Sequence, residues 1–181
     1  MLTGAVALAG CGGGTRQDAN EPSATFKVDV VDASFPAKQH LSKPERLRIA
    51  VKNTGDQDVP DVAVTVDSFS EVSQEQGVAD PQRPVWLVDA APRGGTTAYV
   101  NTWALGRLRP GQTRTFTWRV TAIEPGEHKV RWTVSAGLNG KATARLNDNR
   151  VPEGEFTVNV SPKPSQASVD PATGKVVRSS D

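Results

Sequence analysis

Few side chains in this chain of 181 residues could serve as nucleophiles or bases: it has one cysteine and two histidines. A Ser/His/Asp or Cys/His site needs a histidine within hydrogen-bond reach of its nucleophile. His40 and His128 each lie near a lysine in a hydrophilic, turn-like stretch, so we expect both to be solvated. A copper site on a β-sandwich would need both histidines and Cys11, which lies outside the strand-forming region. We therefore expect a protein that is not an enzyme.

Loop carboxylates are the remaining candidates for metal ligation, because calcium prefers hard oxygen ligands. They occur in two places, at Asp56 and Asp58 with Asp61, and at Asn147-Asp148-Asn149. Neither set has the spacing of a calcium-binding loop, and acidic residues in loops usually cap turns. We expect no metal site and no cofactor.

Cys11 is the only cysteine, which excludes an internal disulfide and a multi-cysteine metal site. It ends an apolar run of small residues, Leu8-Ala9-Gly10-Cys11. These four residues resemble the lipobox of bacterial lipoproteins, whose cysteine is lipidated and becomes the new N-terminus. The resemblance implies lipidation of Cys11 and attachment to the extracytoplasmic face of the cell membrane. The alternative is an ordinary apolar N-terminus that contains a cysteine by chance.

The segment that precedes Cys11 lacks part of a secretory signal. Such a signal begins with positive charges and continues with an apolar region of about 7–15 residues. No Lys or Arg precedes Cys11, so we expect residues 1–11 to be a truncated lipoprotein signal segment whose true start lies upstream. Residues 12–24 begin with three glycines, and glycine-rich linkers are flexible coils. We expect a flexible linker there.

Residues 25–160 have the pattern of short β-strands, because apolar and polar residues alternate with a period of two. The alternating segments are Phe26–Val30, Leu47–Val51, Val62–Val66, Phe116–Val120, Val130–Ala136 and Phe156–Val160. The turn signals between strands include Pro110-Gly111 and Pro125-Gly126, which suit type II turns, and Asn139-Gly140, which suits a hairpin. Seven to eight strands at this spacing predict an all-β antiparallel β-sandwich.

Two segments do not fit a minimal sandwich. Residues 69–98 form an insertion rich in Gln, Pro, Gly and Ala, and so long a connection is unusual unless it is functional or internally structured. Residues 161–181 are polar and rich in proline, so we expect a disordered tail. Within this tail, Val176-Val177 could dock as a weak edge strand.

The strand and turn sequences resemble those of CARDB-type domains, immunoglobulin-like modules of bacterial surface proteins whose name refers to cell adhesion. The resemblance lies in Leu47–Gly55 with Val59–Val64, in Leu108–Thr113 leading into Phe116-Thr117-Trp118, and in Pro125–Val130. It spans about residues 45–160 and implies an immunoglobulin-like fold with no catalytic residues to carry over. The insertion at 69–98 departs from the family pattern, so the resemblance does not carry a partner with it.

The aromatic residues offer one candidate binding surface. Trp118 and Trp132 share the parity of the core valines, so we expect them in the core. Trp86, Tyr99 and Trp103 lie in or beside the insertion, where they form either a small core under the loop or an exposed patch that marks a binding surface.

These observations favour a lipid-anchored extracytoplasmic protein whose domain serves protein binding, adhesion or cell-envelope structure. One alternative is a module that binds carbohydrate or a cell-wall polymer through the aromatics of the insertion. A weaker alternative is an accessory subunit of a secreted enzyme or transporter. We expect the membrane as a partner through the lipid anchor, and a protein or envelope polymer as a second partner. A pI of about 7.9 argues against nucleic acid, whose binding domains typically have a pI above about 9.

Overall fold

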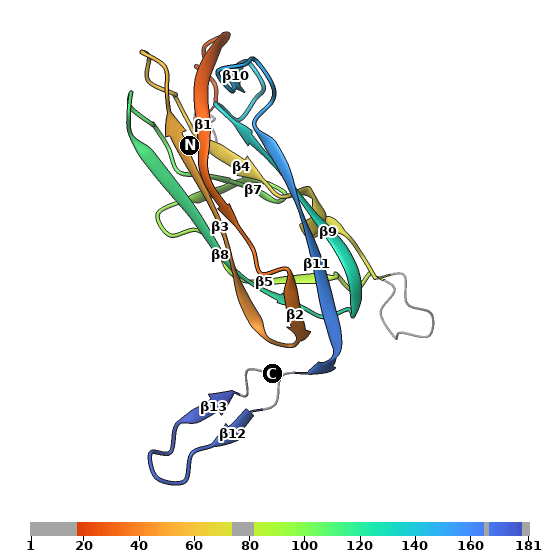
Figure 1. Cartoon of the computed structure of the whole chain (residues 1–181). Coiled ribbons are helices and arrows are strands. Elements are labelled where there is room, and N and C mark those ends of the chain that lie inside the picture. Colours follow the sequence, from red (N-terminus) through yellow and green to blue (C-terminus); the bar gives the residue numbers. More distant parts are fainter. Residues whose placement is uncertain (1–17, 74–81, 165–166, 179–181) are drawn as a thin grey trace, which may run out of the picture.

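The fold is known from a computed structural model that describes residues 18–73, 82–164 and 167–178. Two β-sheets pack face to face, and a separate hairpin lies beyond one end of them (Figure 1). The prediction of an all-β sandwich is confirmed. The described residues contain no α-helix, only the short 3-10 helix η1 (Asp67–Ser70). Nor does any helix among them have the length and apolar character needed to span a bilayer.

The first sheet has five strands in the order β10-β1-β3-β8-β5. Their bounds are β1 (Ala24–Ser34), β3 (Pro44–Asn53), β5 (Trp86–Ala90), β8 (Thr113–Ala122) and β10 (Ala142–Arg145). The long strands β3 and β8 pair antiparallel at the centre, with Leu47 opposite Trp118 and Ile49 opposite Phe116. β10 pairs with β1 in parallel at one edge, and β5 forms the other edge.

The second sheet has six strands in the order β2-β11-β9-β4-β7-β6. Their bounds are β2 (Lys38–Leu41), β4 (Ala63–Thr65), β6 (Thr96–Tyr99), β7 (Thr102–Ala104), β9 (Gly126–Ser135) and β11 (Glu153–Pro164). β2 pairs with β11 in parallel, while β11 and β9 form a long antiparallel pair. Only residues 35–37 separate β1 from β2, so the chain changes sheets within three residues.

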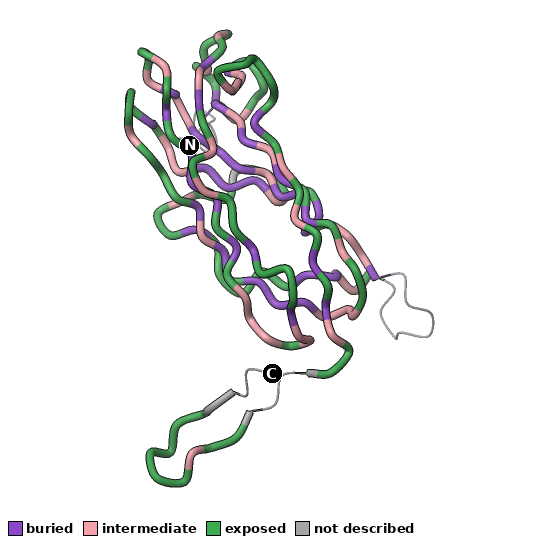
Figure 2. The backbone as a smooth tube through the Cα atoms, viewed as in Figure 1, coloured by how far each residue is buried: buried purple, intermediate pink, exposed green. Residues whose placement is uncertain are grey.

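The core lies between the sheets, where apolar residues of alternating parity meet. Figure 2 shows buried positions interleaved with exposed ones along the strands. Trp118 and Trp132 are buried, as their parity predicts. Trp118 stacks on Phe116, with ring centroids 5.8 Å apart, and meets Trp103 edge to face at 5.5 Å. The buried aromatic residues therefore fill one continuous core, as large apolar side chains do in sandwich domains.

The strand count of the prediction was too low because the insertion is structured. Residues 69–98 include β5 and β6, and β7 follows directly, so the insertion adds strands to both sheets. Residues 74–81 of the insertion lie outside the described residues. The prediction of a hairpin at Asn139-Gly140 was wrong. β9 and β10 flank this turn, but they belong to different sheets, and β10 pairs with β1 instead.

The type II turn predicted at Pro110-Gly111 is present. Gln112 N donates to Arg109 O at 3.0 Å, and Gly111 has a φ of 73°. A positive φ at the third turn position is the conformation that glycine adopts without steric cost. The turn delivers the chain into β8, so this local signal fixes the start of a central strand.

The ends of the domain differ from the predicted boundaries. Residues 12–17 lie outside the described residues, but residues 18–23 pack on the sandwich rather than forming a free linker. At the other end β11 continues to Pro164 instead of ending at residue 160. Beyond it β12 (Ala167–Val169) and β13 (Val176–Arg178) form an antiparallel hairpin, so the predicted tail contains strands. Val176-Val177 pairs within this hairpin and not with an edge of the sandwich.

Candidate binding surface

A basic groove crosses the outer face of the five-stranded sheet. Because Leu47, Ile49 and Val51 point into the core, the alternate residues of β3 point outward. The same alternation on β8 turns its threonines and Arg119 outward. The groove has a volume of about 880 Å³, and its charged lining is Arg46, Arg48, Arg93, Arg119 and Glu45.

The arginines of this groove lie close to one another across the paired strands. Arg46 on β3 is directly opposite Arg119 on β8, and Arg48 is opposite Thr117. Like charges directly opposite in an antiparallel pair destabilise the sheet, and opposed Cβ atoms lie about 5 Å apart. The sheet therefore carries a local concentration of positive charge, and the repulsion between Arg46 and Arg119 destabilises the pairing of β3 with β8.

Most of this positive charge has no internal counter-ion. Arg48 lies 3.7 Å from Asp32 in an ion pair open to solvent, and Glu45 is 3.0 Å from Lys43. Within the described part of the chain, the guanidinium groups of Arg46, Arg93 and Arg119 make no hydrogen bond or ion pair. Exposed pairs of the Arg48–Asp32 kind contribute only about 0–1 kcal/mol, so they leave Arg48 available to a ligand.

Apart from the buried Trp118, the rest of the groove lining is polar or small. Thr115 and Thr117 of β8 contribute hydroxyl groups, while Pro44, Ala90 and Ala91 contribute small apolar surfaces. The arrangement suits a ligand with anionic groups and hydrogen-bonding hydroxyls, because guanidinium groups bind carboxylate and phosphate oxygens with two parallel hydrogen bonds.

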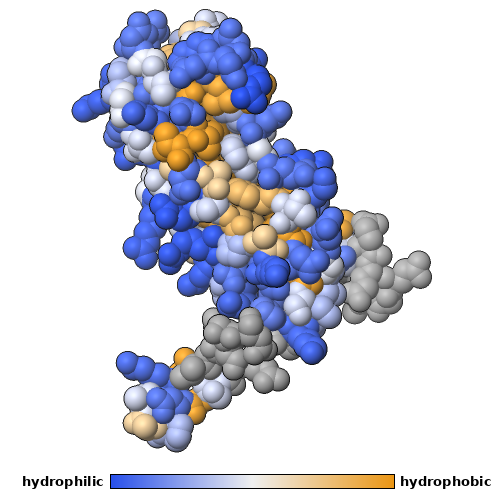
Figure 3. Space-filling view, viewed as in Figure 1, coloured by the Kyte–Doolittle hydropathy of each residue, from blue (hydrophilic) through white to orange (hydrophobic). Residues whose placement is uncertain are grey.

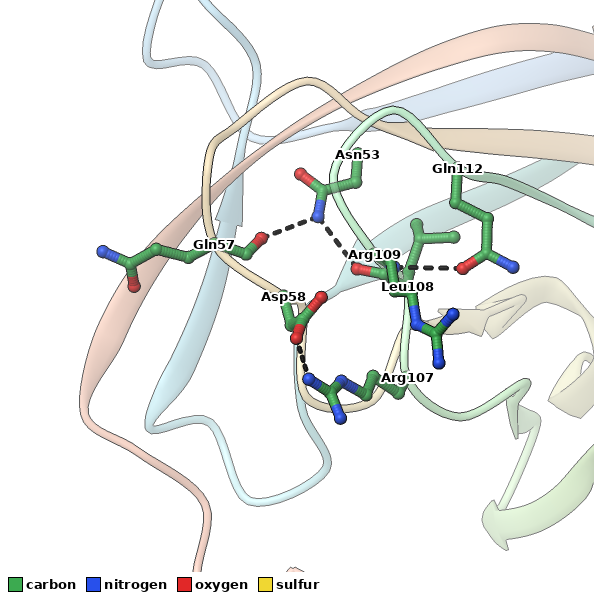
Figure 4. Close-up of polar contacts among 7 residues, drawn as sticks. All are labelled: Asn53, Gln57, Asp58, Arg107, Leu108, Arg109 and Gln112. Carbon is green, nitrogen blue, oxygen red and sulfur yellow. Dashed lines mark hydrogen bonds and ion pairs between the residues drawn. The ribbon is translucent and has the colours of Figure 1, made fainter.

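Two loops at one end of the sandwich are tied together by a buried asparagine. The Asn53 side chain is fully buried, and its Nδ2 donates to Gln57 O at 2.7 Å and to Leu108 O at 2.8 Å (Figure 4). Its Oδ1 accepts from Gly55 N at 2.9 Å. Asn53 thus satisfies the backbone of both loops, which explains the Asn-x-Gly pattern at the end of this strand. The role of Asn53 is structural.

The loop acids considered for calcium bind groups of the protein itself. Asp58 pairs with Arg107 (Figure 4), and Asp61 Oδ1 accepts from Gly106 N at 2.9 Å. Asp148 pairs with Arg150 at 2.6 Å, and its pKa is held below the ordinary value by hydrogen bonds from the Arg150 side chain and backbone. The described residues contain no group of three or more His, Cys, Asp or Glu side chains arranged to hold a metal ion.

The Glu21 carboxylate fixes the entry of the chain into the domain. It accepts from the backbone N–H groups of Leu138 at 2.6 Å, Asn139 at 2.8 Å and Ala142 at 2.7 Å. Burial raises the pKa of Glu21, but these N–H groups outweigh it and hold the pKa below its ordinary value. A hollow of about 310 Å³ lies beside this contact, lined among others by Asp18, Glu21 and Asp61. Tyr99, the loop amides and Gly106 already engage these carboxylates.

Replacing Glu21 by glutamine is expected to lower the free energy of unfolding by about 1–2 kcal/mol at pH 7, because charge-assisted hydrogen bonds become neutral ones. The folded-state pKa is depressed, so this contribution is present above the unfolded pKa of about 4.3 and is lost as pH falls through the folded value. Urea denaturation should show a smaller difference in free energy of unfolding between the variant and wild type at pH 3 than at pH 7. Glu153→Gln, at an exposed strand position, is the control, and an equal effect at both pH values would contradict the interpretation.

The aromatic residues of the insertion do not form a joint surface. Trp86 is 2% exposed and Trp103 is 6% exposed, so of the two possibilities these residues take the core, and the exposed binding patch is wrong for both. They are buried because β5 belongs to the five-stranded sheet and β7 to the six-stranded sheet, and each strand turns its tryptophan toward the core between the sheets. Tyr99 is 46% exposed, and its hydroxyl donates to Asp18 Oδ2 at 2.9 Å.

Three other residues were considered for chemistry in the sequence, namely Cys11, His40 and His128. Cys11 is outside the described residues. His40 and His128 are half-buried rather than fully solvated, and each ring has a structural partner. His40 Nδ1 lies 3.2 Å from Lys163 O, whereas His128 packs edge to face on Trp86 with ring centroids 5.7 Å apart. Neither histidine faces the groove.

Apolar surface is also exposed in places. Figure 3 shows a mostly hydrophilic face with a hydrophobic band along the middle, at the seam between the sheets. β1 and β11 face each other across this seam without pairing (Figure 1).

Comparisons with known proteins found similar solved structures. No family model matches the chain, and no curated protein matches it significantly. Among solved structures, the CARDB domain of a Pyrococcus furiosus protein, crystallised in complex with di-metal ions, is 18% identical with a TM-score of 0.47, covering 76% of this chain and 94% of that one. A solution NMR structure of the same domain is 20% identical with a TM-score of 0.44, covering 75% and 93%. The chain is structurally similar to this CARDB domain.

Two other similar structures are much larger proteins, of which the match covers a small part. A β-glucosidase from Listeria innocua is 17% identical with a TM-score of 0.38, over 77% of this chain but 16% of the enzyme. A Salmonella alpha-2-macroglobulin is 20% identical with a TM-score of 0.42, over 78% of this chain and 7% of that one.

Sequence reasoning missed the groove. The alternation of β3 and β8 already places Arg46, Arg48 and Arg119 on outward faces, which was the available signal. The pairing of β3 with β8 is a contact between distant segments, however, and only the register shows that Arg46 and Arg119 are neighbours.

Proposed function

We propose that this chain is a lipid-anchored extracytoplasmic binding protein whose CARDB-like sandwich binds a partner in the cell envelope. The observation that supports binding best is the groove, where Arg46, Arg93 and Arg119 have no partner within the described residues. The groove lies on the central strands of a sheet, and sites built on such elements hold their geometry better than sites on loops. This proposal favours adhesion or envelope structure over catalysis.

The anchor is proposed from the lipobox resemblance at Leu8-Ala9-Gly10-Cys11. Two or more acyl chains on Cys11 would hold the protein at the membrane, since one chain alone binds only marginally. The sandwich would then stand outside the membrane, with the linker between the lipid and residue 18.

Replacing Cys11 by alanine is expected to abolish incorporation of labelled palmitate and to move the protein from the membrane fraction to the soluble extracytoplasmic fraction. The physical reason is the loss of the thiol that accepts the lipid. The experiment labels cells that express the gene with its natural start, and Ser23→Ala, at an exposed position close to the domain, is the control. Unchanged labelling of the Cys11 variant would contradict the anchor.

Partner binding is tested separately by crosslinking in intact cells. The wild-type protein is expected to be recovered attached to an envelope component, and the variant Arg46→Ala/Arg119→Ala is expected to be recovered alone. Recovery of wild-type protein without any envelope component would contradict the proposed function. Because this readout does not depend on palmitate labelling, the anchor and the binding role can fail independently.

A further inference from the structure

The chemistry of the groove points to the kind of ligand that it takes. Two arginines on one face of a strand, Arg46 and Arg48, have Cα atoms about 7 Å apart because a strand rises about 3.4 Å per residue. Arg119 lies directly across from Arg46, at the shorter cross-strand distance of about 5 Å between Cβ atoms. Arg93, from the segment after β5, adds a fourth charge at the wall. A single anion would leave most of these guanidinium groups without a counter-ion, whereas a chain with repeated anionic groups engages several.

The position of the groove argues against a peptide as this ligand. Extended peptides bind sheets by pairing with an edge strand. β3 and β8 are interior strands whose backbones are already paired on both sides. The apolar lining consists of Pro44, Ala90, Ala91 and Trp118, and the Trp118 side chain is itself completely buried.

A lipid surface and nucleic acid also fit poorly. Membrane-surface sites combine basic residues with large apolar side chains that enter the bilayer, and the groove lining has no exposed large apolar residue. Nucleic-acid binding domains carry a strongly basic balance, whereas this chain has a formal net charge of +1. The threonine hydroxyls at Thr115 and Thr117 provide both donors and acceptors, which suits the hydroxyl groups of sugars.

We infer that this groove binds an acidic polysaccharide, a glycan chain that carries a carboxylate or a phosphodiester at regular intervals. Arg46, Arg48 and Arg119 form bidentate hydrogen bonds with successive anionic groups, and Thr115 and Thr117 hydrogen-bond sugar hydroxyls. This assignment deepens the proposed function and rests on it, because it names the envelope component that the anchored domain binds. The inferred polymer-binding site is thus the outer face of the five-stranded sheet, and not the tryptophans of the insertion, which are buried.

The opposed arginines predict a second property of the complex. Anionic groups between Arg46 and Arg119 neutralise a repulsion that the free protein contains. The ligand therefore stabilises the folded state both by mass action and by relieving this repulsion. For the same reason, the variant Arg46→Ala/Arg119→Ala is expected to melt no lower than wild type in the absence of ligand.

The test measures binding of the full chain to polygalacturonate, as the carboxylate polymer, and to poly(glycerol phosphate), as the phosphodiester polymer, at about 150 mM salt, where distant charges are screened. Dextran, polyglutamate and vesicles of phosphatidylglycerol with phosphatidylcholine are the comparison probes. The groove variant is Arg46→Ala/Arg119→Ala. The matched control is Arg109→Ala/Arg114→Ala, which removes two exposed arginines outside the groove.

Wild type is expected to bind one of the two acidic polymers and to melt at a higher temperature in its presence. The groove variant should bind at least roughly tenfold more weakly, while the control pair changes by less than about twofold. Arg46→Lys/Arg119→Lys should recover only part of the affinity, because lysine keeps the charge but not the bidentate geometry. Which of the two polymers binds distinguishes a carboxylate glycan from a phosphodiester glycan.

Three results would overturn the inference. The first is no binding of either acidic polymer by wild type, and the second is equal weakening in the groove variant and the control pair. The third is equally tight, groove-dependent binding of polyglutamate or of the vesicles, which would assign the groove to an acidic peptide or to a membrane. Failure of the proposed function is distinct from these, because crosslinking in cells would then recover no envelope component at all.

Discussion

Replacing Asn53 by alanine is expected to lower the free energy of unfolding by about 3 kcal/mol. The substitution removes three hydrogen bonds of a fully buried side chain and takes from Gln57 O the amide that it accepts from. Leu108 O still accepts from Val59 N, and Gly55 N still donates to Lys27 O. A hydrogen bond contributes about 1 kcal/mol net, and a buried group left unsatisfied costs about 1–3 kcal/mol. Urea denaturation of the full chain, followed by tryptophan fluorescence, measures the change. Asn159→Ala, at an exposed position on β11, should stay within about 0.5 kcal/mol of wild type.

The isosteric change Asn53→Asp separates hydrogen bonding from packing. Aspartate fills the same space, but its ionised carboxylate cannot donate to the two carbonyl oxygens that Asn53 contacts. We expect a loss at pH 7 at least as large as that of the alanine variant, because a buried charge faces two acceptors. Near-wild-type stability of Asn53→Asp at pH 7 would show that the side chain does not tie the loops together.

Replacing Trp118 by alanine is expected to cost about 3–5 kcal/mol, the usual range for truncating a large buried aromatic residue. Trp118 is completely buried at the centre of the core, stacked on Phe116 and in edge-to-face contact with Trp103. The cavity would lie between the two central strands and the opposite sheet, where neighbouring rings cannot collapse without losing contacts of their own. Denaturation by urea measures the loss, and a midpoint within error of wild type would contradict the central role of this ring.

Trp118→Phe is the informative companion of this variant. Within the described residues, the indole N–H of Trp118 is buried and has no hydrogen-bond acceptor. Phenylalanine keeps an aromatic ring against Phe116 while it removes this unpaired donor, so part of the packing loss is offset. We expect a cost well below that of alanine. Equal costs for the two variants would mean that the ring retained against Phe116 contributes nothing to stability.

The sequence carried enough information for the fold class because each long strand has a strict period of two. That pattern places Leu47, Ile49, Phe116 and Trp118 on the inner faces, and the structure buries all four. Local turn chemistry was informative where the turn is local, as at Pro110-Gly111. Both signals arise within a few neighbouring residues, so a single sequence contains them.

Pairing between strands that are distant in the chain has no comparable local signal in the sequence. β10 pairs in parallel with β1, more than a hundred residues earlier, and a two-residue turn signal cannot report such a partner. The strand β7 has three residues, too few to show a period. The candidate site depends on the same kind of information, since Arg46 and Arg119 become neighbours only through the β3–β8 register. Sequence reasoning therefore located the solvent-exposed faces of β3 and β8 but not the groove that they form together.

The parallel pairing of β2 with β11 affects how the domain responds to mechanical force. β1 begins at one end of the sandwich and β11 ends at the other (Figure 1). A pull on the two ends of the domain draws β2 in one direction, through β1, and β11 in the opposite direction, along their shared axis. The bonds at Asn159, Val160 and Ser161, opposite Lys38, Gln39 and His40, are then loaded together in shear rather than opened one by one. Under such a pull on its two ends, the β2–β11 pair would act as the clamp that resists separation of the domain.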